Sequence, residues 1–253
     1  MYFDTHVHLN SEQYENVDEI VNNALENGVN KMVVVGYDLE TSLKAIQIAK
    51  QYEFIYAAVG MHPSEIKKMN KDDLDKIESL LTNEKVVAIG EIGLDYHWDK
   101  DNKEEQKEVF IKQIKWSNKY NLPIIIHSRD SAEDTFNVLK ENKMYYKKGI
   151  MHCYSYSLEL AKEFIKLGFM LAFGGALTFL NSKQNKEVVQ EIDSKHLLTE
   201  TDAPYLTPHP YRGKRNEPKY IHLVVEEMSR LKNINEEEMS QIVYNNACDF
   251  FEV

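Results

Sequence analysis

Short runs of β-branched and other apolar residues alternate with longer amphipathic segments along the whole chain. The apolar runs predict eight strands, near residues 2–8, 31–36, 54–59, 86–91, 123–127, 149–152, 169–173 and 197–201. The segments between them predict helices near 16–27, 40–51, 71–82, 103–120, 131–141, 157–167 and 183–192, followed by a closing helical region from about 217 onward. This alternation is typical of βα units that build a parallel sheet.

Cap residues support several of these boundaries. Gly28 and Gly168 stand where helices are predicted to end, and Asn70 and Asp134 stand near predicted helix starts. Eight strands with alternating helices in 253 residues match the (β/α)₈ TIM barrel, an α/β fold, so we expect a single barrel domain over residues 1–253. An open doubly wound sheet is the alternative. It is the weaker one, because no G-x-G-x-x-G follows the first strand.

The composition fits an enzyme-sized globular domain. Hydrophobic residues make up 43% of the chain, enough to bury a substantial core. No targeting signal is recognised at the N-terminus, and no run approaches the roughly 18 apolar residues of a membrane span. The only cysteines, Cys153 and Cys248, suggest no disulfide framework. We therefore expect a cytoplasmic protein without a membrane partner.

The charge balance restricts how nucleic acid could be bound. A formal charge of −11 argues against a broad polyanion-binding surface, but it does not exclude a local cationic pocket. Of the 30 basic residues only four are arginines, namely Arg129, Arg212, Arg215 and Arg230. Three of them fall in two short stretches predicted to be loops. Their planar guanidinium groups suit bidentate contact with phosphate or carboxylate.

The first strand ends in two histidines separated by one residue. On a strand, His6 and His8 project to one face, whereas Phe3, Thr5 and Val7 take the other. Two imidazoles on one face form half of a metal site. Seen alone, this pair is explained equally well as half-buried strand residues that are hydrogen-bonded to the backbone.

Further metal-ligating side chains stand at the ends of other predicted strands. In a barrel the strands run in one direction, so these residues would meet at the C-terminal face, where barrel active sites lie. The set comprises His6, His8, Glu91, His127, His152 and Asp202. Without a cation, this cluster of buried polar groups would be costly. Six ligands with one bridging carboxylate suit two divalent ions, which activate water for a displacement. Mg, Mn and Zn all remain open as their identity.

Several segments resemble motifs of one family, the TatD-like metal-dependent deoxyribonucleases. The similarity covers Phe3–Asn10, Val59–Pro63, Gly90–Tyr96, Pro123–Arg129, His152–Ser155, Glu200–Leu206 and Arg212–Pro218. It spans the whole chain and implies a metal-dependent hydrolase barrel. The resemblance further implies one ion on His6, His8, Glu91 and Asp202, and a second on Glu91, His127 and His152.

Other polar residues are candidates for substrate contact. By resemblance, His62 lines the pocket, although it could instead cap the turn before Pro63. Arg129 lies two residues past His127 and would share its face on an extended backbone, where it could meet a phosphate oxygen. Arg212 and Lys214, with Arg215, form a basic loop after the last strand that is either a contact surface or a solvated turn.

Three more residues are assigned supporting roles. Glu200 shares the strand parity of Asp202 but lies one layer deeper, which suits support of a ligand or packing inside the barrel. Tyr154 and Tyr205, in predicted rim loops, could stack on a base.

Together with the resemblance, these residues predict a deoxyribonuclease that uses two divalent ions. It would act on single-stranded DNA or strand ends, with Asp202 as general base, Glu91 as the bridging ligand, and no obligate protein partner. A small-molecule amidohydrolase or lactonase with the same binuclear site is the alternative. A non-catalytic relative of the barrel is a further one, but it predicts a lost ligand, and all six are present.

Overall fold

The computed structural model describes residues 1–98 and 100–253. Within them, parallel strands follow one another around a sheet in the order of the sequence. They are β1 (Tyr2–Val7), β2 (Val29–Val35), β3 (Ile55–Val59), β4 (Val86–Asp95), β5 (Ile124–Arg129), β6 (Gly149–Met151), β7 (Phe169–Phe173) and β8 (Leu197–Thr199). The predicted TIM barrel is confirmed, and the open doubly wound sheet is excluded.

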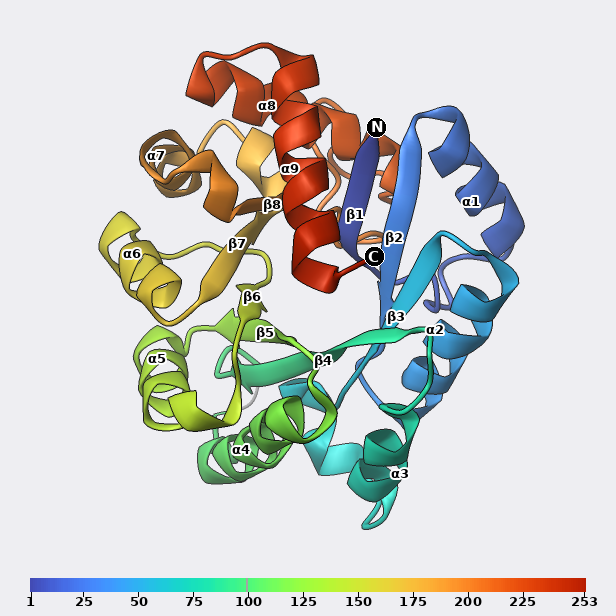
Figure 1. Ribbon diagram of the computed structural model, residues 1–253, viewed down its shortest axis with the longest axis vertical. Helices are drawn as coiled ribbons and strands as arrows, with labels where there is room; N and C mark the ends of the chain where they lie inside the picture. The colour runs from blue at the N-terminus through green and yellow to red at the C-terminus, as the bar shows by residue number, and fades with distance from the viewer. Residues whose placement is uncertain (99) are drawn as a thin grey trace.

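Helices surround this barrel (Figure 1). They are α1 (Val17–Glu26), α2 (Leu39–Gln51), α3 (Asp73–Leu80), α4 (Lys103–Tyr120), α5 (Ala132–Glu141), α6 (Leu158–Lys166), α7 (Lys183–Glu191), α8 (Ile221–Lys232) and α9 (Glu236–Phe251). Most predicted boundaries agree within a few residues. Gly28 and Gly168 do end helices, at φ values of +80° and +88° that favour glycine.

Two predicted boundaries are wrong. Asn70 does not cap α3, which begins at Asp73; instead the backbone N–H of Asn70 donates to the Asp73 carboxylate at 2.8 Å. Strand β4 runs to Asp95 rather than ending at Glu91, because its second half pairs with β5 as far as Arg129. This extension adds a second inward-facing carboxylate to the strand.

Polar contacts hold the first strand against the last at the barrel's seam. The Thr5 hydroxyl donates to the Thr199 carbonyl at 3.0 Å. Beyond the strand end, the Asp202 N–H donates to the His6 carbonyl at 2.9 Å, and the His8 N–H donates to the Ala203 carbonyl at 2.8 Å. The seam therefore fixes three predicted site residues relative to one another.

The core has two parts. The larger lies between the strands and the surrounding helices and includes Val7. The smaller contains side chains from all the strands and from α9, which lies across the barrel with both chain ends beside it (Figure 1). Phe3 belongs to this inner part, so the prediction that Phe3 and Val7 share a face is wrong. A register shift between Asp4 and Val7 separates them.

Two expectations from composition can be compared with the fold. Among the residues the structure describes, no helix is long and apolar enough to cross a membrane. Cys153 and Cys248 are both free thiols.

Candidate metal centre

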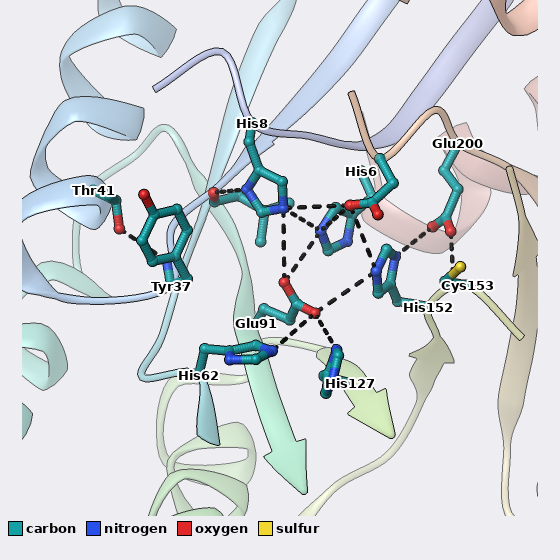
Figure 2. A network of polar contacts seen from close by, with 12 residues as sticks. His6, His8, Tyr37, Thr41, His62, Glu91, His127, His152, Cys153 and Glu200 are labelled. Carbon is teal, nitrogen blue, oxygen red and sulfur yellow. Dashed lines mark hydrogen bonds and ion pairs between the residues drawn. The ribbon is translucent and has the colours of Figure 1, made fainter. Parts of the chain in front are cut away.

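The carboxylate of Glu91 lies at the centre of the predicted ligand cluster (Figure 2). Its Oε2 is 3.4 Å from Nε2 of His6 and 3.8 Å from Nε2 of His8. Its Oε1 is 2.8 Å from Nδ1 of His127 and 3.7 Å from Nε2 of His152. One carboxylate thus faces two pairs of imidazoles, one pair on each oxygen.

Asp202 completes the cluster from the segment after β8. Its Oδ1 is 3.4 Å from Nε2 of His8, 3.8 Å from Nε2 of His152 and 3.9 Å from Nε2 of His6. The Asp202 side chain is 14% exposed, against 5% for Glu91. The structure therefore brings all six predicted ligand residues together, with Asp202 on the more open side.

A close approach of two strands positions His127. Gly93, opposite His127 in the β4–β5 register, has φ +146°. A Cβ on Gly93 would lie 1.9 Å from the His127 carbonyl oxygen, so only glycine fits there. The sequence Gly90–Tyr96 therefore supplies Glu91 and also the gap into which the backbone of His127 fits.

Hydrogen bonds on the outer side of three imidazoles fix their orientation. Nδ1 of His8 donates to the Val35 carbonyl at 2.9 Å, because a carbonyl can only accept. Nδ1 of His152 lies 2.9 Å from Oε2 of Glu200, and Nε2 of His127 lies 3.0 Å from Oδ2 of Asp95. With these nitrogens donating outward, the other ring nitrogens face the centre and would present lone pairs to a cation that displaces their protons.

This donor set fits divalent cations. Lone pairs that face carboxylate oxygens repel one another unless a positive charge lies between them. Nε2 of His6 is 3.2 Å from Nε2 of His8, close to the ~3.3 Å expected for two nitrogens on one tetrahedral ion. Among the residues that the structure describes, four groups of three offer ligand atoms within 4.8 Å of one another: His6–His152–Asp202, His6–His8–Glu91, His62–Asp95–His127 and Glu91–His127–His152. Imidazole and carboxylate ligands suit Zn, Mn, Fe or Co.

Charge coupling inside the cluster is strong. Burial lowers the pKa of His152, but Glu200 and Glu91 outweigh it and raise the pKa to about 10. Burial raises the pKa of Glu91, yet the surrounding imidazoles hold it well below its usual value. The site thus keeps its carboxylates ionised and attracts positive charge.

His62 lies beside the cluster, as expected from the sequence. Its Nε2 is 3.7 Å from Oε1 of Glu91, and its ring centroid is 4.2 Å from that of His127. Its Nδ1 accepts from the Ser64 N–H at 3.1 Å. Burial, with the charge on His127, lowers the pKa of His62 to about 3, so this imidazole is neutral near neutral pH. It both caps the turn and borders the ligand cluster.

Two carboxylates with supporting positions were not singled out from the sequence. Asp95 bonds to His127, and Asp4 accepts from the Thr201 N–H at 2.9 Å and the His6 N–H at 3.2 Å. The sequence could have indicated both residues, because side chains an even number of positions apart on a strand point to the same face. Asp95 lies four residues after Glu91, and Asp4 lies two residues before His6. By contrast, Glu200 occupies the supporting position that its parity predicted.

The basic residues predicted to contact substrate lie at the C-terminal end of the barrel, where the metal-ligand cluster also lies. Arg129, at the end of β5, places its guanidinium 5.5 Å from the centroid of the Trp98 ring. The guanidinium carbon of Arg212 lies 4.1 Å from the centroid of the Phe179 ring, and Nζ of Lys214 lies 5.5 Å from the centroid of the Tyr211 ring. These three side chains are exposed. Arg215 instead donates to the Gln13 carbonyl at 2.7 Å and has a structural contact.

One of the two tyrosines expected to stack on a base is misassigned. Tyr154 is 2% exposed and packs against Phe164 and Phe173, so it belongs to the core. Tyr205 is 47% exposed, and its ring centroid lies 6.0 Å from that of His8. Only Tyr205 is available to a ligand.

The chain is similar to known proteins over its whole length. Residues 3–252 match the family model described as TatD related DNase. A Bacillus subtilis protein named as an uncharacterized metal-dependent hydrolase is 50% identical over 254 residues, covering 100% of both chains. One with the same description from Methanocaldococcus jannaschii is 36% identical and covers 99% of this chain and 96% of its own.

Solved structures agree with these relationships. The crystal structure of the TatD homolog YjjV from Escherichia coli has a TM-score of 0.95 and 30% identity, over 100% of this chain and 98% of its own. A hydrolase of the TatD family from Entamoeba histolytica has a TM-score of 0.87 and 26% identity, over 98% of this chain and 97% of its own. An organophosphorus hydrolase mutant, at 13% identity and a TM-score of 0.64, shares the fold.

Proposed function

Since this chain belongs to the TatD-related DNase family, a family of metal-dependent hydrolases, we propose that its barrel, residues 1–253, hydrolyses DNA phosphodiester bonds from strand ends. The observation that carries the proposal is the position of Glu91, whose two oxygens face His6 and His8 on one side and His127 and His152 on the other. This arrangement suits two ions that share one carboxylate.

We assign the first ion to His6, His8, Glu91 and Asp202, and the second to Glu91, His127 and His152. Divalent ions such as Mg, Mn or Zn would supply Lewis acidity to the scissile phosphate and make the attacking water more acidic. A bridging Glu91 would differ from the modified lysine with which many amidohydrolases join their two ions.

The chain's own residues divide the remaining work. Asp202, ionised and more exposed than Glu91, is the base that accepts the proton of the attacking water. Arg129 offsets negative charge on the phosphoryl oxygens, and Arg212 and Lys214 hold the backbone of the strand. His62 is a neutral imidazole whose Nδ1 accepts from the Ser64 N–H, so its Nε2 carries the hydrogen and can donate a hydrogen bond beside Glu91.

Burial of the site favours strand ends. Glu91 is 4% exposed and His6 is 1% exposed, so the scissile phosphate must reach down into the barrel mouth. An unpaired terminus can do so more easily than the middle of a stiff duplex. End-labelled single-stranded and duplex DNA, incubated with Mg or Mn, should therefore lose nucleotides stepwise from an end.

A parallel assay with amides and lactones, under the same metals, tests the alternative function. If DNA stays intact with every divalent metal while amides or lactones are hydrolysed, the amidohydrolase function replaces the nuclease.

The bridging role of Glu91 has its own test. We expect Glu91→Gln to weaken binding at both metal sites together, because each site loses the same charged ligand. Metal titration of the apo protein, followed by calorimetry, should show about two ions for the wild type and a parallel loss of both affinities in the variant. If Glu91→Gln bound both ions with wild-type affinity, the carboxylate would not be the bridge.

A further inference from the structure

A tryptophan stands exposed on the turn that follows β4. Trp98 is 72% exposed, whereas Trp116 is 3% exposed in the core. A large aromatic side chain in water is unfavourable, and such residues commonly mark binding surfaces. The turn follows the C-terminal end of β4, so it lies at the same end of the barrel as the residues of the metal centre.

One carboxylate ties this turn to the metal centre. Oδ1 of Asp95 accepts the backbone N–H of His97 at 2.8 Å and that of Trp98 at 3.2 Å. Oδ2 of the same Asp95 faces Nε2 of His127 at 3.0 Å. The position of the indole is thereby coupled to that of a centre imidazole through a single side chain.

Arg129 adds a positive charge at the same place. Its guanidinium lies 5.5 Å from the centroid of the Trp98 ring, and its backbone carbonyl accepts from the Tyr96 N–H at 2.9 Å. An aromatic face beside an arginine is the combination that binds an unpaired nucleotide, because the base stacks on the ring and the phosphate pairs with the guanidinium.

We propose that Trp98 and Arg129 form a subsite that stacks an unpaired nucleobase next to the phosphate held at the metal centre. This inference rests on the proposed nuclease function and adds to it a binding site for the base. Stacking would bind any of the bases, since every base has a flat face. A protein partner fits less well, because the indole shares its supporting carboxylate with the metal centre.

Fluorescence offers a direct test. In a Trp116→Phe background, Trp98 is the remaining indole, so its emission reports the subsite alone. The metal-loaded protein is titrated with a short single-stranded phosphorothioate oligonucleotide that resists hydrolysis, and with a matched strand of base-less tetrahydrofuran units. We expect quenching and tight binding with the first, and weaker binding without quenching with the second.

The variant comparison makes the result specific. Trp98→Ala should weaken binding of the base-containing strand by roughly 5–150-fold, the range for loss of one stacked base. It should leave binding of the base-less strand unchanged. Met144→Ala is the matched control, because Met144 is 71% exposed but lies before β6, at the opposite end of the barrel. It should bind both strands like the wild type.

Failure of the subsite and failure of the nuclease give different results. If wild type cleaves DNA but Trp98→Ala binds both strands like wild type and no quenching occurs, the subsite is wrong and the nuclease function stands. If wild type neither cleaves DNA nor binds either strand in any metal, the nuclease function fails and the subsite fails with it.

Discussion

Asp202 can both bind a metal ion and accept a proton. Its carboxylate faces the ring nitrogens of His8, His152 and His6, and its side chain is partly exposed to solvent. We expect Asp202→Asn to lower turnover of DNA by roughly 10²–10⁴-fold, the usual worth of a general base. Binding of DNA should be largely kept, since asparagine preserves the shape. Single-turnover cleavage at saturating metal, with the bound metal quantified, separates loss of the base from loss of an ion.

A wild-type rate in Asp202→Asn with its metals in place would exclude Asp202 as the base. The proton would then have to leave through another group, and His62 is a weak base for this step because burial lowers its pKa to about 3.

Asp95 acts through His127 and is a positioning residue. Asp95→Asn removes the charged acceptor of the His127 ring and should weaken metal binding by about 10–100-fold, as found for carboxylates that orient ligating histidines. Metal titration measures this loss, and excess metal should restore most of the activity. The thermal unfolding of the apo variant serves as a control for folding. Unchanged metal affinity would show that the hydrogen bond does not orient the ring.

Between elements, one ion-pair group joins α7 to α8. Glu227 on α8 is 2.9 Å from Nζ of Lys186 on α7, and Arg230 donates to both of its oxygens at 2.8 and 2.9 Å. Hydrogen bonding by Arg230 lowers the pKa of Glu227. A lowered pKa stabilises the fold above the ordinary value of about 4.3, and this stability is lost as the pH falls through the folded-state pKa.

Glu227→Gln should therefore lower the free energy of unfolding by about 0.5–1 kcal/mol at neutral pH. The difference from wild type should shrink as the pH falls below about 4, because the wild-type carboxyl then becomes neutral too. Urea unfolding at several pH values measures it. Glu226→Gln removes the same charge from an exposed position on α8 and should change stability less. A pH-independent difference would contradict the ion-pair account.

For the molecule as a whole, α9 completes the inner core opposite the metal centre. Phe3 at the start of β1 is 1% exposed, and its ring centroid lies 5.7 Å from that of Phe251. Phe3→Ala should lower the free energy of unfolding by about 3–5 kcal/mol, because it leaves a cavity where β1 meets α9. Chemical denaturation gives the value. The control is Leu180→Ala, which should change the free energy of unfolding little because the Leu180 side chain is 87% exposed. A loss below about 1 kcal/mol for Phe3→Ala would mean that α9 moves in to fill the space.

The sequence by itself determined the elements and the membership of the site. Apolar periodicity depends on neighbours a few residues away, so it located the strands and helices within a few residues. Parallel strands in a barrel present their carboxyl ends at one face, so residues as distant in sequence as His6 and Asp202 could be placed in one cluster.

Tertiary structure decided what depends on pairing between strands. The register shift in β1 separates Phe3 from Val7, and β4 continues to Asp95 because β5 offers it a partner as far as Arg129. The burial of Tyr154 and the exposure of Trp98 were also settled by packing, since neither follows from residue type. Local patterns carry no information about which surface a distant strand or helix will cover, and for that physical reason these features appeared only in the folded chain.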